Sequence, residues 1–424
     1  MNNDPSNSNG RRAGGLLKTG IVFSAISFVT GLGNMAFQGV MGRHLNEPGQ
    51  YGNANSAISG FMPLLALLPS VASFAVTHYI AHFNARGDTA RLQGLFMGCR
   101  RFLFRLTVLG SLLAVIVVGP LSDFFHFSRS LTLVTLGCTL LGLWGSFATA
   151  LCQGLAWFKR LAFIGLLAMT LRMAFGWLVT LKWPSAETAV LASAFALLAN
   201  LVLLFWRKDL SLHGEPVSPW DREFVQYLIV STACVGGGYC FFQGDLLVAK
   251  KFFPHQDLDA YTAAGSLARA LLFAVAPLLT VLFTSRSSAQ TGGIVMEQLK
   301  LLGLNFLGLI FGAAALFVLR AFYVKLIFGK SVPEAEAMIS QLAITMVFVG
   351  LLQALALWAL ASRWMKISLL YGVLGVGYWL TLLVRGQSPT ALLQTMPVAA
   401  GTAFGLMFLV WFLTMRRHKA TATN

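Results

Sequence analysis

Charged residues are scarce in this chain of 424 residues. They make up 11% of the sequence, whereas hydrophobic residues make up 57% and the mean hydropathy is +0.72. This amount of polar material is too small to cover a soluble core of that size. The composition therefore excludes an ordinary soluble globular protein and predicts a protein that crosses a membrane several times.

Patterns typical of enzymes and of metal sites are also missing. The loops contain no acidic pair, nucleophile motif or glycine-rich phosphate loop, so we expect no catalysis and no cofactor. The cysteines have neither metal-ligand spacing nor an extracellular loop to join, and we interpret them as free thiols in apolar surroundings. They are Cys99, Cys138, Cys152, Cys234 and Cys240.

Long apolar runs separated by short polar loops fill the chain between Gly15 and Met415. A helix needs about 20 apolar residues to cross a hydrocarbon core of roughly 30 Å. The runs predict twelve membrane spans, and the fold class is therefore an all-α polytopic membrane protein. The predicted spans are 16–41, 53–80, 96–119, 131–153, 161–181, 188–206, 224–248, 261–283, 299–322, 338–359, 367–384 and 392–415.

Lysine and arginine are distributed unevenly between the two sides of these spans. Loops on the side of the amino terminus carry more than twice as many of them as loops on the opposite side. Positive charge in short loops marks the cytoplasmic side, so both termini are predicted to be cytoplasmic. This topology and contacts with anionic membrane lipids explain the net charge of +16, and we expect no nucleic-acid partner.

The two halves of the sequence share a plan. We expect a disordered cytoplasmic tail over 1–14, a six-helix bundle over 15–206, a cytoplasmic linker over 207–223, a second six-helix bundle over 224–415 and a tail over 416–424. In each half a polar loop ends in a tyrosine, Tyr51 or Tyr261, that opens the next helix. Pro69 then follows Tyr51, and Pro277 follows Tyr261, at nearly the same distance along the sequence.

Paired repeats with prolines at matching depth are typical of an alternating-access carrier, whose site lies between the halves. Pro63, Pro69 and Pro277 would supply the bends, because a proline ring removes one backbone hydrogen bond of a helix. Proline is also common in membrane helices, and coincidence is the alternative explanation for the match.

Segments 38–82 and 243–286 resemble the polysaccharide-export flippases of the multidrug/oligosaccharidyl-lipid/polysaccharide superfamily, the Wzx-type translocases. The matching residues are Gly42, Arg43 and Leu45 closing on Tyr51 and Gly52, the run from Asp245 to Lys250, and the run from Tyr261 to Ser266 leading to Pro277. The chain departs from relatives in having no acidic residue in its first span, and it lacks the two extra carboxy-terminal spans of the lipid II flippases.

The resemblance implies a MATE-like, V-shaped pair of six-helix bundles in a bacterial cytoplasmic (inner) membrane. It implies a flippase that moves an undecaprenyl-diphosphate-linked oligosaccharide to the outer leaflet for exopolysaccharide, O-antigen or capsule assembly. A polysaccharide polymerase and glycosyltransferases would then be its partners. The alternatives are a cation-coupled multidrug extruder of the same superfamily and a non-transporting membrane scaffold of a polysaccharide synthase.

Arg172 is the first candidate for contact with the substrate. It lies at the middle of its span, roughly 15 Å from either surface, which is further than a guanidinium comfortably reaches. A charge at that depth costs a few kcal/mol, so we expect it to face protein or water. A diphosphate offers the bidentate geometry that a guanidinium matches. The alternatives are that Arg172 forms a structural ion pair or that its span is drawn in the wrong place.

Arg269 and Asp245 are candidates in the second half. Arg269 follows Tyr261 by about 12 Å of helix and reaches either the lumen or the outer interface. Asp245 lies near the outer end of its span, where Lys250 or Arg269 is within reach. We expect a surface salt bridge there, with cation or proton coupling as the alternative role of Asp245.

Amide and imidazole side chains are the remaining candidates. Asn34 and Gln38 are four residues apart and share one helical face, and His78 lies near the inner end of the next span. Facing a cavity, these groups would bind sugar hydroxyls. Hydrogen bonding between neighbouring helices is the alternative.

Overall fold

The structure is a computed structural model that describes residues 26, 29–67, 76–77, 79–81, 83–84, 86–155, 157–205, 222–288, 295–362 and 364–422. Every element among these residues is helical, and this part of the chain contains no strand. The protein is therefore all-α, as its apolar runs predict.

The helices follow one another with short connections. A first helix covers 29–44. The later elements are α2 (Gln50–Asn55), the π-helix η1 (Ser56–Phe61), α3 (Met62–Leu65), α5 (Thr89–Phe125), α6 (Arg129–Gly154), α7 (Phe158–Lys182), α8 (Ala186–Phe205), α9 (Arg222–Phe252), α10 (His255–Ser288), α11 (Val295–Val318), α12 (Arg320–Phe328), α13 (Pro333–Ala361), α14 (Met365–Arg385) and α15 (Pro389–Ala422).

The predicted spans coincide with these helices. Each of the twelve lies on helical segments where the structure describes it, except for single turn residues at Ala66 and Leu319. Six of the described helices are long and apolar enough to cross a membrane by length and composition, and a bent pair brings the number to seven. The helices are mostly longer than the predicted spans, because polar turns continue them beyond the apolar run; α5, for example, extends over 37 residues.

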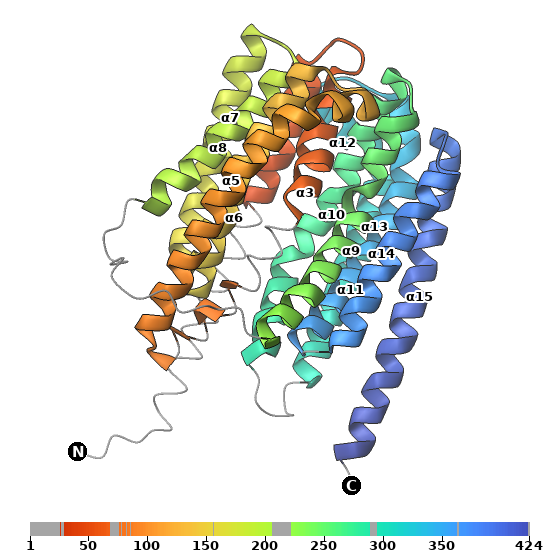
Figure 1. Ribbon diagram of the computed structural model, residues 1–424. Helices are drawn as coiled ribbons and strands as arrows, with labels where there is room; N and C mark the ends of the chain where they lie inside the picture. Colours follow the sequence, from red (N-terminus) through yellow and green to blue (C-terminus); the bar gives the residue numbers. More distant parts are fainter. Residues whose placement is uncertain are drawn as a thin grey trace, which may run out of the picture.

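The helices form two groups (Figure 1). Helices α5 to α8 pack against one another on one side of the molecule, and α9, α10, α11, α13, α14 and α15 pack together on the other. In the second group α13 is the central helix, since 78% of its most apolar stretch is buried, compared with 11% for α5 at the edge of the first. Residues 206–221, most of the predicted linker, lie outside the described residues.

The second predicted span is irregular at its start. It begins as α2, continues as the six-residue π-helix η1 and returns to α-geometry at Met62. Pro63 is the second residue of α3. A proline there has no amide to bond the carbonyl one turn earlier, which is consistent with the altered hydrogen bonding just before it.

The ninth predicted span differs from a single straight helix. It divides at Leu319 into α11 and α12, which are bent by 80°. Arg320 ends the apolar run, and α12 also carries Lys325, so polar residues mark the change of direction. At the end of the chain α15 continues to Ala422, past the predicted end of the last span at Met415.

Candidate functional site

A polar cavity of about 240 Å³ lies between the two groups of helices. Its first-half walls come from the helix over 29–44, from the irregular segment of α2, η1 and α3, and from α7; its second-half walls come from α9 and α10. The lining residues are Asn34, Met35, Gln38, Asn55, Ile58, Ser59, Pro63, Arg172, Gln243, Ser266, Arg269 and Phe273. None of them is acidic, so the cavity has a positive lining.

Arg172 enters this cavity from α7 and makes few contacts. Its Nη1 donates a hydrogen bond to Asn34 Oδ1 over 2.9 Å, and its guanidinium carbon lies 4.2 Å from the centre of the Phe37 ring. Its Nε is buried without a hydrogen-bond partner. None of the described carboxylates forms an ion pair with it. Arg172 therefore carries an uncompensated charge and spare donors at the edge of the cavity.

Two glycines bring α7 close enough for these contacts. A β-carbon on Gly176 would lie 2.4 Å from Phe37 Cε2, and one on Gly33 would lie 2.2 Å from Met169 Sδ. A β-carbon at position 176 would displace the Phe37 ring, whereas one at position 33 meets the end of the flexible Met169 side chain, which can move aside. Gly176 thus lets α7 hold Arg172 beside Asn34 and Phe37.

The amides and hydroxyls of the cavity form one network across the two halves. Gln38 Nε2 donates to Asn55 Oδ1 over 2.8 Å, and Ser59 Oγ donates to the same oxygen over 2.8 Å. Asn55 Nδ2 in turn donates to Ser266 Oγ on α10 over 3.3 Å, and the Tyr51 hydroxyl lies 3.4 Å from that oxygen. The network joins the first half to α10 at the depth of the cavity.

Arg269 and Asp245 form an ion pair, but the expectation of a surface salt bridge is wrong. The Arg269 Nη2 to Asp245 Oδ2 distance is 2.5 Å, and the side chains are 5% and 0% exposed. Tyr261 donates a hydrogen bond to the same carboxylate oxygen, and Arg269 Nε donates to the Phe242 carbonyl. The pair is buried because α9 continues to Phe252, which places Asp245 two turns inside the helix end.

Three of the other predicted residues line the cavity, and the remaining three lie outside the described part of the chain or have side chains outside it. Asn34 and Gln38 line the cavity, as does Pro63. His78 and Pro69 fall on residues outside those described, and Pro277 falls within α10 with its side chain outside them. No group of three His, Cys, Asp or Glu side chains that could hold a metal occurs among the described residues.

Sequence reasoning missed Asn55 and Ser266 as residues that complete the cavity, and it interpreted Gln243 as a side chain that hydrogen-bonds between helices. Asn55 is 1% exposed and Gln243 is 8% exposed, with Gln243 Oε1 lacking a hydrogen-bond partner. Ser266 lies four residues after Thr262 on α10 and donates to its carbonyl. The signal available was their position within apolar runs, where a polar side chain needs a partner or a cavity.

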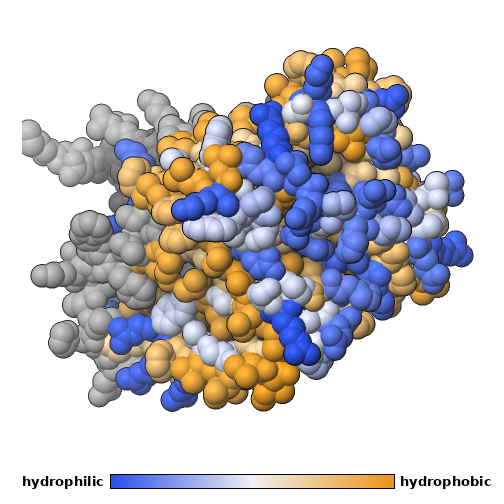
Figure 2. All heavy atoms as spheres, turned by 90° about the horizontal axis from the view of Figure 1, so that it is seen from above, coloured by the Kyte–Doolittle hydropathy of each residue, from blue (hydrophilic) through white to orange (hydrophobic). Residues whose placement is uncertain are grey.

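A second contact between the halves, which sequence reasoning also missed, closes one end of the molecule. Asp259 on α10 accepts hydrogen bonds from the backbone N–H groups of Gly49 and Gly52, over 2.7 and 2.6 Å. We refer to Asp259, Gly49 and Gly52 as the clasp. Gly49 has φ +83°, a conformation that favours glycine. Figure 2 views the molecule from above the upper end in Figure 1, where polar residues gather over the middle.

Two cations support the clasp from neighbouring elements. Arg43 donates to the carbonyls of Leu326 and Ile327 on α12, over 2.5 and 3.0 Å. Lys250 Nζ donates to Asn53 Oδ1 over 2.6 Å. Burial lowers the pKa of Lys250 to about 8, while the Asp259 carboxylate opposes that shift.

Comparison with known proteins shows which solved structures share this fold. No protein-family model and no curated protein matches the sequence. In structure, an inward-facing multidrug resistance MATE family transporter of the MOP superfamily matches with a TM-score of 0.68 and 14% identity, over 94% of this chain and 99% of that one. The chain has the MATE-like fold.

Two further structures with this fold have different cargoes or pockets. The lipid II flippase MurJ, in an inward closed conformation, matches with a TM-score of 0.70 and 11% identity, over 92% of this chain and 87% of that one. A MOP superfamily transporter from Pyrococcus furiosus, described as having a binding pocket of reversed polarity, matches at 0.63 and 14%, over 93% and 95%. The fold is thus shared by proteins whose binding pockets differ, and the cavity lining must distinguish them.

Proposed function

We propose that this protein is a flippase that moves a diphosphate-linked lipid oligosaccharide across the bacterial cytoplasmic membrane by alternating access. The observation that carries the proposal is Arg172, an unpaired guanidinium at the edge of a cavity between the two halves. A cation at membrane depth is costly unless it serves a ligand or a partner. No described carboxylate serves as that partner.

The cavity lining suits an anionic, hydroxyl-rich head group. A guanidinium binds phosphate oxygens through two parallel hydrogen bonds, and such charge-assisted contacts are about twice as strong as neutral ones. Asn34, Gln38 and Gln243 offer amides of the kind that bind sugar hydroxyls. Arg269 adds no free charge, since Asp245 neutralises it.

The size of the cavity supports a moving pair of halves. At about 240 Å³ it is smaller than typical ligand pockets, which are roughly 300–1,000 Å³. A diphosphate with its first sugar would need the two groups of helices to separate around it. The polyprenyl tail would stay in the lipid beside the bundle, and the assembling polymerase and glycosyltransferases would be partners on either side.

The proposal is tested by translocation of a fluorescent oligosaccharide-diphosphate-polyprenol in sealed proteoliposomes. Arg172→Ala should lower the rate about 10- to 100-fold, the value of a charged hydrogen bond of roughly 1.5–3 kcal/mol. Arg172→Lys should retain part of the activity, because it keeps the charge and loses the bidentate geometry. The matched control is Arg160→Ala at the start of the same helix, where the guanidinium lies over the Trp157 ring. Wild-type translocation by Arg172→Ala would contradict the proposal.

A cation-coupled multidrug extruder is the second candidate, favoured by the multidrug transporters among the matching structures. The cavity argues against it, because a lipophilic cation would meet Arg172 and no lining carboxylate. In the same proteoliposomes an extruder would move a lipophilic cation against its gradient. The flippase would not, and Arg172→Ala would affect only the lipid-linked cargo.

A further inference from the structure

A groove of about 1,020 Å³ runs along the outer surface between α14 and α15. It is separate from the central cavity and shares no lining residue with it. The α14 wall extends from Val373 to Arg385 and the α15 wall from Gln394 to Leu406. Each wall is about 18 Å long at 1.5 Å per residue. The groove therefore extends over roughly one leaflet of a 30 Å hydrocarbon core.

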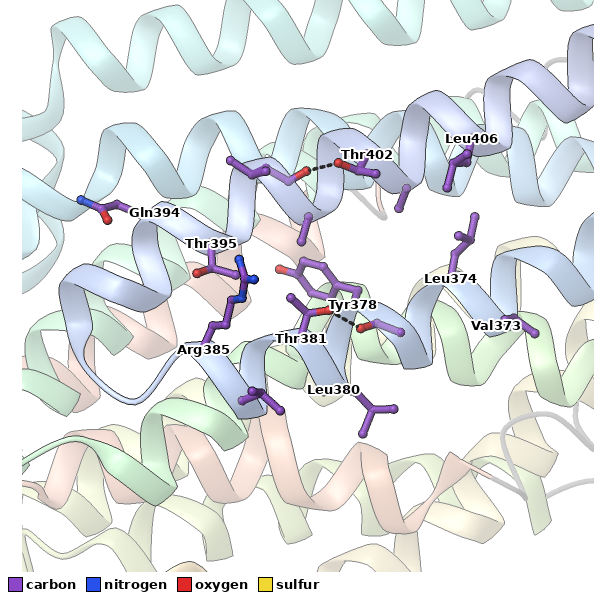
Figure 3. Close-up of a pocket in the computed structure, with 15 residues that line it drawn as sticks. Val373, Leu374, Tyr378, Leu380, Thr381, Arg385, Gln394, Thr395, Thr402 and Leu406 are labelled. Carbon is purple, nitrogen blue, oxygen red and sulfur yellow. Dashed lines mark hydrogen bonds between the residues drawn. The ribbon is translucent and has the colours of Figure 1, made fainter.

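One end of the groove is polar (Figure 3). Arg385, Gln394, Thr395 and Thr381 lie there, and the Tyr378 ring projects between the two helices with its hydroxyl end toward them. Arg385 is exposed and forms no ion pair with any described residue. Tyr378 is 3% exposed, and its hydroxyl is buried without a hydrogen-bond partner. This end thus offers a free cation at the surface, whereas the Tyr378 hydroxyl lies beneath it.

The rest of the groove is largely apolar and open to the membrane. Val373, Leu374 and Leu406 continue it away from Arg385, with Thr402 as a polar residue near Leu406 whose hydroxyl donates to the Val398 carbonyl. Val373 and Val398 are 68% and 69% exposed, as expected of side chains that face acyl chains. A polar head region followed by an apolar channel of leaflet length matches the shape of a membrane lipid.

We propose that the α14–α15 groove binds one anionic phospholipid, with its phosphate at Arg385 and an acyl chain along the channel toward Leu406. Arg385 supplies both the charge complement and the hydrogen-bond donors for the phosphate oxygens, because the hydroxyls of Thr381 and Thr395 already donate to backbone carbonyls. The site does not depend on the cargo of the central cavity.

Native mass spectrometry of the purified full chain, titrated with phosphatidylglycerol, tests the site. Arg385→Gln should weaken phosphatidylglycerol binding about five-fold, the value of one basic residue at a lipid surface. Gly377→Leu should abolish the tightest binding of phosphatidylglycerol. Position 377 lines the groove and a β-carbon there meets open space, so the leucine side chain fills the channel without a clash.

Matched controls lie elsewhere on the same surface. Gly405→Leu makes the same substitution at a position on α15 that also meets open space and does not line the groove. Arg129→Gln removes an exposed arginine at the start of α6. Both should bind phosphatidylglycerol as the wild type does. Equal binding by Gly377→Leu and the wild type would overturn the proposal. So would a lipid-free dimer joined at this face, or occupancy by a lipid-linked oligosaccharide alone.

Discussion

Asp245 and Arg269 illustrate the cost of ionised side chains inside a helical bundle. Asp245 is fully buried, and one of its oxygens receives both Arg269 and Tyr261 while the other has no hydrogen-bond partner. Such a pair adds little stability compared with apolar residues of the same volume. Removing one member is costly, however, because the other is left as a buried charge without a partner. The pair therefore joins α9 to α10. Because Asp245 is engaged in it, this carboxylate is less available to bind a coupling ion.

Removing one member of this pair should destabilise the protein strongly. We expect Asp245→Asn or Arg269→Met to lower the free energy of unfolding by about 3–5 kcal/mol. The double variant should lose less free energy of unfolding than the two single variants lose together, since it leaves no unpaired charge. Thermal unfolding in detergent measures each. Arg91→Met, which breaks the exposed pair with Asp88, is the control and should cost less than about 1 kcal/mol. An equally small loss for Asp245→Asn would refute this account.

Single residues differ in how far the sequence reveals them. Arg172 could be found because a cation in the middle of an apolar run has few acceptable surroundings, and depth follows from counting residues. Asn34 could not be identified as its partner, since the hydrogen bond joins residues 138 positions apart. The same limit applies to Asn55 and Ser266, which meet across 211 positions. Pairing between distant helices depends on the packed fold.

At the scale of elements, the clasp depends on how α2 begins. The chain turns at Gly49 with φ +83°, and α2 then presents backbone N–H groups to Asp259. A β-carbon on Gly52 would lie 2.9 Å from Asp259 Oδ1 and 2.6 Å from Leu258 Cγ. Only glycine allows this approach, so the irregular second span is joined tightly to α10 at this end.

Loss of the Asp259 carboxylate should open this end of the molecule. In a variant without the native cysteines, Ser266→Cys places a thiol in the cavity. We expect Asp259→Ala to raise its labelling by a membrane-impermeant thiol reagent several-fold, because two charge-assisted hydrogen bonds of roughly 1.5–3 kcal/mol each are lost. Asp257→Ala removes the same charge two residues earlier and should leave labelling unchanged. Unchanged labelling in both variants would mean that the clasp does not control access.

The sequence predicts most elements correctly as helices, but it does not predict where those helices become irregular. Apolar runs of spanning length determine that a helix forms, because a membrane leaves backbone groups no other partner. The π-helix before Pro63 and the 80° bend at Leu319 were not predicted. Leu319 adjoins no proline or glycine, so its bend follows from the packing of α12 against α10, α11 and α13.

At the scale of the whole molecule, the two halves enclose the cavity from both ends. The clasp closes the upper end in Figure 1. On the other side of the network, Gly31 on the first helix packs against Phe273 of α10: a β-carbon on Gly31 would lie 3.4 Å from Phe273 Cβ. Transport by alternating access needs these two contacts to separate in turn, since the cargo enters past one and leaves past the other.

A disulfide between Gly31→Cys and Phe273→Cys should lock the halves together. The 3.4 Å separation is close to the Cβ to Cβ distance of about 3.5–4.5 Å found in disulfides. In a background without the five native cysteines, oxidation should stop translocation in proteoliposomes, and reductant should restore it. Each single cysteine variant, oxidised in the same way, should transport as before. If the crosslink forms, as shown by mass spectrometry, and translocation continues, the halves do not need to separate here, and the cargo passes by a route other than this contact.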